Sequence, residues 1–233
     1  MRRVDLSLVL ACFNEGPTLN NSLAKIVEVL KLLRYSWEII AIDDNSSDET
    51  YQILKKFSKN RKHFSVFKNT QNIGRGGTVF LGVKRAKGKV VGFIDVDLEV
   101  SPVYIPEFVR AIDKGVDLAI ATRIYKDSFA SINRWLLSKG YRYITKHFLN
   151  LNIKDTEAGY KFFNQKKMLP VLEKTQDKKW FFDTEIIIRS VAKKLKIVEI
   201  PVLFLRRDDK KSTVKIIPDV VAYIKAIYKF KKQ

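Results

Sequence analysis

The chain has 233 residues, of which 46% are hydrophobic and 12% aromatic, so it can bury the core of one large domain and is not wholly disordered. Its 44 Lys and Arg residues against 25 Asp and Glu residues leave a net charge of +19. This charge predicts an anionic partner, such as a nucleic acid, a phosphate-rich substrate or an acidic membrane surface. One cysteine excludes an internal disulfide, and two histidines exclude a Cys/His zinc cluster.

The first half of the chain alternates between strand and helix patterns. Buried strands are predicted at residues 6–13, 37–42, 64–67, 90–95 and 118–121, and helices after Pro17, from Ser47 and after Gly74. This alternation predicts a mostly parallel, doubly wound α/β sheet flanked by helices. Ligands of such sheets bind beyond the carboxyl ends of the strands.

The second half is less regular. A basic helix is predicted at residues 128–149, strands at 161–163 and 198–205, and further helices at 183–195 and 218–232. No repeat or low-complexity linker divides the chain, which favours a single domain with a distinct second half. No stretch reads as a signal peptide or reaches the roughly 18 apolar residues of a membrane span. We therefore expect a cytoplasmic chain that touches a membrane without crossing it.

Polar clusters follow four of the predicted strands. They are Asn14-Glu15, Asp43-Asp44, Asp95-Val96-Asp97 and Thr122-Arg123. Because the carboxyl ends of parallel strands lie at one edge of the sheet, these clusters are expected to meet there.

Asp95 and Asp97 indicate a metal site. In an extended chain, residues two apart face the same side, and two adjacent carboxylates repel unless a cation or proton separates them. Mg²⁺ or Mn²⁺, bound by one or two carboxylates and by substrate phosphates, meets this need. Glu99 continues the alternation and can reach the same ion. The alternative is a solvated acidic turn, which a position directly after an apolar strand disfavours.

Two further segments suit a nucleotide. Asp43 and Asp44 can accept hydrogen bonds from a base or ribose, and the helix that follows favours an anion; capping by Ser46, Ser47 or Asp48 does not explain them. In the segment 72–78, glycines let backbone N–H groups approach a phosphate, and Arg75 adds a planar cation. A simple glycine turn that starts a helix is the alternative there.

Together these segments resemble glycosyltransferase family 2, whose members have the GT-A fold. The matching segments are Ala11-Cys12-Phe13-Asn14-Glu15, Asp43 to Thr50, Asn72 to Gly77 and Asp95-Val96-Asp97. The resemblance implies a nucleotide-binding half at residues 1–125. It implies that Cys12, Asn14, Glu15, Asp43, Asp44, Asn72, Gly74, Arg75, Asp95 and Val96 bind the nucleotide, and that Asp95, Asp97 and Glu99 bind Mg²⁺ or Mn²⁺.

The second half resembles the dolichyl-phosphate mannose and glucose synthases of that family. The matching segments are Asp155 to Phe163, Trp180 to Glu185, Glu199 to Val202 and Ser212. The departures from the family pattern are Ala11 for proline, Asn45 for glycine, Arg75 for lysine and Thr213 for lysine. The resemblance implies inverting transfer of glucose or mannose from UDP-glucose or GDP-mannose to a polyprenyl or dolichyl monophosphate.

A phosphate monoester is already anionic near pH 7, so this acceptor needs positioning cations and no general base. The resemblance implies Asp97, Arg123, Arg134 and Arg207 as the catalytic residues and places Asp155, Glu157, Lys211 and Ser212 on the acceptor side, within residues 126–215. The alternative is a family 2 enzyme that acts on a saccharide hydroxyl, with Asp155 or Glu157 as the base.

Two basic segments indicate an anionic membrane surface. Residues 123–154 hold seven Lys and Arg residues against one acid, and residues 206–233 hold nine against three. Both carry apolar stripes with aromatic residues, as interfacial helices do. For the C-terminal helix, 216–233, packing on the core is an equal alternative. We expect peripheral attachment to the cytoplasmic face of a membrane, and a separate membrane subunit is a possible partner. Nucleic-acid binding is disfavoured because the acidic strand-end clusters would repel phosphate.

Overall fold

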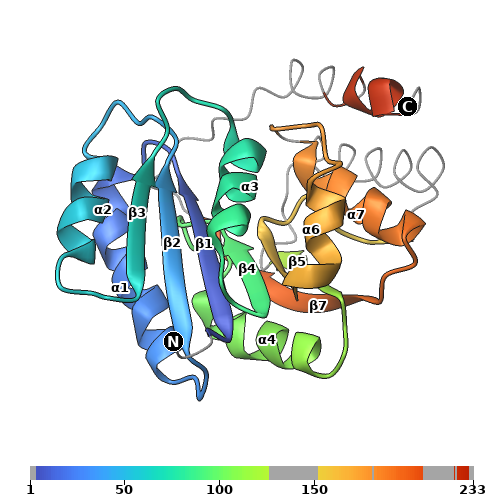
Figure 1. Ribbon diagram of the computed structural model, residues 1–233, viewed down its shortest axis with the longest axis horizontal. Helices are drawn as coiled ribbons and strands as arrows, with labels where there is room; N and C mark the ends of the chain where they lie inside the picture. The colour runs from blue at the N-terminus through green and yellow to red at the C-terminus, as the bar shows by residue number, and fades with distance from the viewer. Residues whose placement is uncertain (1–3, 126–151, 180, 207–222, 224, 231–233) are drawn as a thin grey trace.

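The computed structural model describes residues 4–125, 152–179, 181–206, 223 and 225–230, and they form one seven-stranded sheet with helices on both faces (Figure 1). The strands are β1 (Leu6–Cys12), β2 (Trp37–Asp43), β3 (Phe64–Lys68), β4 (Val90–Ile94), β5 (Leu118–Tyr125), β6 (Tyr160–Asn164) and β7 (Ile197–Phe204). The helices are α1 (Gly16–Lys31), α2 (Thr50–Ser58), α3 (Arg75–Arg85), a 3₁₀ turn η1 (Pro102–Tyr104), α4 (Ile105–Asp113), α6 (Gln165–Leu172) and α7 (Phe182–Ala192).

The strand order is β3-β2-β1-β4-β6-β5-β7, and the sheet is mostly parallel, as predicted. β1 pairs in parallel with both β2 and β4, and this register places Cys12 opposite Asp43. β6 is antiparallel to its neighbours β4 and β5. A strand from the second half of the chain therefore lies inside the sheet, between two strands from the first half.

All seven predicted strands are present, although β5 continues four residues beyond its predicted end, to Tyr125. Helices α4 and α6 were not predicted. Both are short, and α6 contains Pro170, which weakens a helical pattern. The predicted helix 128–149 lies outside the described residues, and of the predicted helix 218–232 only residues 223 and 225–230 are described, all of them helical.

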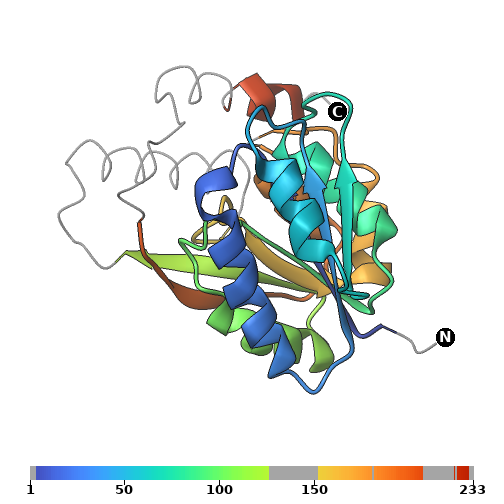
Figure 2. The same ribbon diagram turned by 90° about the vertical axis from the view of Figure 1, so that its left-hand side faces the viewer.

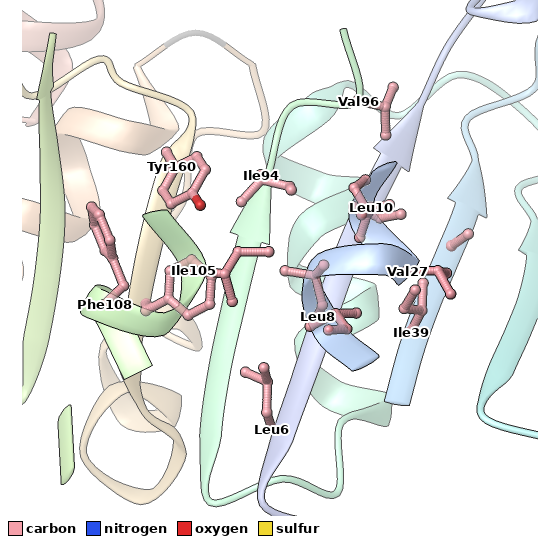
Figure 3. Close-up of a cluster of buried hydrophobic side chains, with 14 of the residues drawn as sticks. Leu6, Leu8, Leu10, Val27, Ile39, Ile94, Val96, Ile105, Phe108 and Tyr160 are labelled. Atoms are coloured by element: carbon pink, nitrogen blue, oxygen red, sulfur yellow. The ribbon is translucent and has the colours of Figure 1, made fainter. Parts of the chain in front are cut away.

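Alternation along each strand divides the core into two layers. Leu6, Leu8 and Leu10 of β1 point to the face covered by α1, α2 and α4, where they belong to one hydrophobic cluster with Ile105 and Phe108 (Figure 3). Figure 2 shows α1 and α2 lying over this face. The intervening residues of β1 and β2 point to the opposite face, which α3, α6 and α7 cover. In sheets with both faces buried in this way, ligands bind beyond the carboxyl ends of the strands.

The C-terminal helical residues pack against α7 (Figure 1). The Tyr223 hydroxyl donates a hydrogen bond of 2.8 Å to Thr184 Oγ1, and the rings of Tyr223 and Phe230 contact Phe181 at centroid distances of 5.3 and 6.0 Å. Ile227 is buried, whereas Tyr228 is exposed. The predicted apolar stripe is thus partly used within the protein. None of the helices in the described ranges has the length and apolar character needed to span a membrane.

Candidate active site

The chain turns sharply after β4. The strand ends at Ile94, Val96 and Asp97 lie in a turn, and Leu98 adopts the left-handed region at φ 56°. The expectation that Asp95 and Asp97 alternate along an extended chain is therefore wrong. The reason is that strand pairing stops at Ile94, which pairs with Tyr160 at the start of β6.

The turn nevertheless brings three carboxylates to one small cavity. Asp95, Asp97 and Glu99 line a space of ≈ 50 Å³, and Val100, Arg123, Gly159, Tyr160 and Phe204 complete its wall. A space of this size holds an ion with a few waters, so a nucleotide sugar has to lie across its mouth. The cavity joins the ends of β4, β5 and β7 to the start of β6.

Arg75 connects the cavity to α7. Its Nε and Nη2 lie 2.7 Å from Asp95 Oδ1, and its Nη1 lies 2.6 Å from Asp183 Oδ2. The other oxygen of Asp183 accepts a hydrogen bond of 2.7 Å from Nζ of Lys161, a wholly buried lysine. Desolvation and the nearby carboxylates of Asp97 and Asp183 raise the pKa of Asp95, while Arg75 opposes this shift. Four charged side chains thus alternate in sign, from Asp95 at the cavity to Lys161 in the core.

Asp44 holds the glycine-rich segment in place. Its carboxylate is 3% exposed and accepts hydrogen bonds from Ile73 N and Gly74 N, both at 3.0 Å, and from Asn69 Nδ2 at 2.8 Å. Gly74 has φ +87°, which glycine adopts readily. The donor groups that Asp44 binds are therefore protein backbone and side-chain groups. The adjacent Asp43 is fully buried at the end of β2, 3.8 Å from Lys68 Nζ.

The loops after β1 and β2 are bonded to each other. Asn14 N donates to Ser46 Oγ at 3.0 Å, and Asn14 Oδ1 accepts from Ser47 N at 2.9 Å. Both serines therefore form hydrogen bonds with the neighbouring loop. Asp48 accepts a hydrogen bond from Thr50 N at the start of α2. Asn45 has φ 62°, a left-handed conformation that suits the glycine found there in the family pattern.

The other residues that were expected to bind the nucleotide lie in the same region. Glu15 N donates to Thr50 Oγ1 at 2.8 Å, and Asn72 Oδ1 accepts from Gly74 N at 3.2 Å. Cys12 is buried at the end of β1, where desolvation raises the pKa of its thiol. The structure thus gathers the expected nucleotide-binding residues along one edge of the sheet, but several of them are bonded to the protein itself.

Arg123 and Asp155 form a multiply bonded ion pair. Arg123 Nε lies 2.7 Å from Asp155 Oδ2, Nη2 lies 3.0 Å from Oδ1, and the backbone N donates to Oδ2 at 3.2 Å. Although desolvation acts in the other direction, Arg123 lowers the pKa of Asp155. A carboxylate with a lowered pKa and several donors is a weak proton acceptor, which disfavours Asp155 as a general base.

Glu157 differs from Asp155. Its side chain keeps an exposed surface, yet the crowding around its carboxyl group desolvates it and raises its pKa to about 7. The carboxylates of Asp155 and Asp183 raise the pKa as well, and Arg123 and Lys161 oppose them. Glu157 therefore changes its charge near neutral pH.

Four predicted site residues lie outside the part of the chain that the structure describes, and three residues at the site were not predicted. Arg134, Arg207, Lys211 and Ser212 lie outside the described residues. Lys161, Asp183 and Gly159 belong to segments that resemble the family, but no role was assigned to them. A charged residue in an otherwise apolar stretch, such as Lys161 between Tyr160 and Phe162, is the signal that could have indicated a buried ion pair.

Comparison with known proteins agrees with this geometry. Residues 7–169 match the family described as Glycosyl transferase family 2. The chain belongs to glycosyltransferase family 2. The match runs through the acidic turn at Asp95, the ion pair of Arg123 and Asp155, and the buried Lys161. The sheet and helices accordingly form the GT-A fold.

Two relatives within the family are similar over nearly the whole chain. A dolichyl-phosphate beta-glucosyltransferase of Saccharomyces cerevisiae is 30% identical, with 98% of this chain and 78% of the relative aligned. A dolichol-phosphate mannosyltransferase of Pyrococcus furiosus is also 30% identical, with 97% and 64% aligned. Glycosyltransferase AglD of Haloferax volcanii is 27% identical, and this chain spans 34% of its length.

Solved structures share the fold of this family 2 chain. The glucosyl-3-phosphoglycerate synthase of Mycobacterium tuberculosis, in complex with Mn²⁺, UDP-glucose and phosphoglyceric acid, has a TM-score of 0.69 at 16% identity. That comparison covers 97% of this chain and 77% of the other. S. aureus TarS in complex with UDP-GlcNAc has a TM-score of 0.62 at 18% identity, with 96% and 65% covered.

The donor atoms of the cavity fit a hard divalent cation of the kind expected from the sequence. Among the described residues, no three Asp, Glu, His or Cys side chains already converge as a complete metal site. Mg²⁺ and Mn²⁺ do not need one, because one or two carboxylates, waters and substrate phosphates complete their coordination. Asp95, Asp97 and Glu99 offer oxygen ligands of this type at one cavity.

Proposed function

We propose that this family 2 glycosyltransferase moves a hexose from a nucleoside diphosphate to a polyprenyl monophosphate, such as dolichyl phosphate, with inversion at the sugar. Relatives named for glucosyl and mannosyl transfer to such lipids align over 97–98% of the chain. The observation that carries the proposal is the cavity in which Asp95, Asp97 and Glu99 lie together with Arg123. It combines a place for a metal-bound diphosphate with a cation for a second phosphate.

On the donor side, the carboxylates of Asp97 and Glu99 would hold Mg²⁺ or Mn²⁺ against the diphosphate. When bound, the metal neutralises the charge that develops on the leaving nucleoside diphosphate. The loops after β1 and β2, tied together through Asn14, fix the edge of the sheet where the base and ribose would lie. Asp44 fixes the glycine-rich segment beside them.

On the acceptor side, an oxygen of the lipid phosphate attacks the anomeric carbon as the bond from that carbon to the diphosphate oxygen breaks. The electron pair leaves with the nucleoside diphosphate, and attack from the opposite face inverts the anomeric centre. Arg123 lines the cavity and is held by Asp155, so it can position this phosphate without a change of rotamer. Arg134 and Arg207, predicted from the sequence to bind the same phosphate, remain proposed ligands of it.

Glu157 supports a second candidate function, transfer to a saccharide hydroxyl. A hydroxyl nucleophile needs a base, and a carboxyl group with a pKa of about 7 is suited to that role. The bonds from Arg123 to Asp155 leave Glu157 as the better candidate of the two. The two functions make different demands on Glu157: it must accept a proton for a hydroxyl acceptor, whereas for a phosphate acceptor its charge is a disadvantage.

A transfer assay separates these functions. The chain is supplied with labelled UDP-glucose or GDP-mannose, together with a short-chain polyprenyl phosphate or a free saccharide, in Mn²⁺, Mg²⁺ or EDTA. We expect label in the lipid fraction with one of the two donors, and none in EDTA. Label that enters only the saccharide would establish the second function. Failure of both transfers with both donors would overturn the proposed activity.

We also propose that the chain acts at the surface of an anionic membrane, since its acceptor is a lipid. The C-terminal helix supports this proposal, because its residues Lys225, Tyr228 and Lys229 are exposed. A separate membrane subunit would serve the same purpose, and co-purification from solubilised membranes tests for one.

A further inference from the structure

Arg75 is surrounded by protein carboxylates. Three of its guanidinium nitrogens lie within 2.7 Å of carboxylate oxygens, two on Asp95 and one on Asp183. The sequence predicts that Arg75 binds a donor phosphate, because a planar cation in a glycine-rich segment suits an anion. In the structure, the groups that would bind a phosphate are already occupied by two carboxylates that come from β4 and α7.

The pairing continues inward. Asp183 is 7% exposed at its side chain, and it shares its two oxygens between Arg75 and the wholly buried Lys161. Lys161 Nζ also donates to the carbonyl oxygen of Ala158. Asp95, Arg75, Asp183 and Lys161 therefore form a chain of two anions and two cations with no net charge. Such a chain avoids the large cost of an unpaired buried charge and fixes the rotamers of its members.

Gly159 closes the arrangement from the other side. A Cβ atom at position 159 would lie 1.9 Å from Asp95 Oδ2 and 2.3 Å from Arg75 Nη2, closer than any real side chain allows. The ion pair therefore packs directly on the backbone of Gly159. The carboxylate of Asp95 is held at one oxygen by Arg75 and has no room to move toward Gly159.

We propose that Arg75 is a positioning residue, which acts with Asp183 and the space at Gly159 to orient Asp95 at the cavity, and that it is not a ligand of the donor diphosphate. This inference rests on the proposed function, because it assigns a role at the same site. Its physical basis is that Asp95 and Asp97 repel each other, so Asp95 keeps one orientation beside Asp97 only while a fixed cation holds it.

If Arg75 positions Asp95, variants at Asp183 and Gly159 should have a defect; if Arg75 binds the diphosphate, they should not. If Arg75 positions Asp95, Asp183→Asn and Gly159→Ala reproduce the defect of Arg75→Gln. We expect each of the three to weaken Mn²⁺ binding in the presence of UDP or GDP by about 10–100-fold, measured by isothermal titration calorimetry. The double variant Arg75→Gln with Asp183→Asn should bind Mn²⁺ no more weakly than the more severe single variant, because both changes remove the same ion pair.

Arg85→Gln is the matched control. Arg85 lies in the last turn of the same helix and packs over Phe67, away from the cavity. It should bind Mn²⁺ and nucleotide as the unchanged chain does. If instead Asp183→Asn and Gly159→Ala bind Mn²⁺ normally while Arg75→Gln alone loses affinity for UDP or GDP in EDTA, Arg75 is a diphosphate ligand and the inference is wrong.

Two further measurements keep the test decisive. Because Asp183→Asn leaves Lys161 buried without its partner, thermal melting has to show that the variant is folded, and Lys161→Met with Asp183→Asn serves if it is not. If the unchanged chain binds neither Mn²⁺ nor a nucleotide, the proposed function fails. Crystal structures of Gly159→Ala and Asp183→Asn then decide the inference: a rotated Asp95 supports it, and an Asp95 that keeps its orientation overturns it.

Discussion

Asp155 accepts three hydrogen bonds from Arg123: two from the guanidinium group and one from the backbone N–H. This arrangement fixes the loop before β6 to the end of β5, at the mouth of the acidic cavity. It also explains why one of the two acidic residues proposed as a base is poorly suited to that role, since its proton affinity is already reduced.

Asp155→Asn should therefore destabilise the fold. The variant leaves Arg123 partly buried with fewer acceptors, which costs about 2 kcal/mol in the free energy of unfolding at pH 7. Because the pKa of Asp155 is lowered by folding, its stabilisation is present above the ordinary value of 3.8 and is lost as the pH falls through the folded-state pKa. Urea denaturation at pH 7 and pH 3 tests this. A difference between variant and unchanged chain that does not shrink on acidification would contradict it.

Glu157 should set the alkaline limit of activity with a lipid phosphate. Its raised pKa of about 7 means that the side chain is neutral below that pH and negative above it. The negative form repels an anionic acceptor, so kcat/KM for polyprenyl phosphate should fall as the pH rises through 7. Glu157→Gln should remove this fall and keep the activity. If Glu157 is a base for a hydroxyl acceptor, activity rises through pH 7 and Glu157→Gln abolishes it.

Asp44→Asn should loosen the glycine-rich segment. One carboxylate oxygen becomes an NH₂ group, which faces a backbone N–H of Ile73 or Gly74 and cannot accept its hydrogen bond. We expect a loss of about 1–3 kcal/mol in the free energy of unfolding and weaker UDP or GDP binding. Glu28→Gln, at an exposed position of α1, is the control and should change stability by less than about 0.5 kcal/mol. Equal stability of both variants would show that Asp44 is free for a ligand.

Asp97→Asn should remove most of the metal-dependent activity. Asp97 lies in the turn after β4 and lines the cavity, so the change removes the negative charge of a proposed metal ligand while keeping nearly the same shape. We expect a fall in kcat of at least about 100-fold, together with nucleotide binding that no longer responds to Mn²⁺. A titration of UDP and GDP with and without the metal measures this. A variant that still binds nucleotide more tightly with Mn²⁺ would place the metal elsewhere.

Lys225→Glu with Lys229→Glu should weaken binding to anionic vesicles. Both lysines are exposed on the C-terminal helix, and each lysine near an anionic surface contributes about 1 kcal/mol, so the pair corresponds to roughly a 30-fold change. Co-sedimentation with phosphatidylserine vesicles at low salt measures it. Lys55→Glu with Lys59→Glu, at exposed positions on α2 and directly after its end, changes the total charge equally and should matter little. No binding by the unchanged chain would end the membrane proposal.

The strands were predictable because each is a short apolar run that ends in polar residues, and those ends showed where a ligand would lie. The turn after β4 was not, because pairing with β6 stops at Ile94 and only the folded sheet shows this. The ion-pair partners of Arg75 could not be predicted from the sequence either. Asp183 is 108 residues away in the sequence, and no local pattern indicates that the two meet. Asp44 could not be assigned either, since a buried acceptor of backbone N–H groups has the same sequence signature as a ligand-binding carboxylate.

The position of β6 constrains how the protein is made. β4 and β5 precede it in the chain but do not pair with each other. β4 pairs with β1 on one side, and its other edge, like the facing edge of β5, has no partner until Tyr160–Asn164 arrives between them. During synthesis on the ribosome, these two facing edges of β4 and β5 therefore stay exposed until more than 160 residues have been translated. From this topology we expect that the protein needs a chaperone that shields such edges, or that its refolding ends in a slow step.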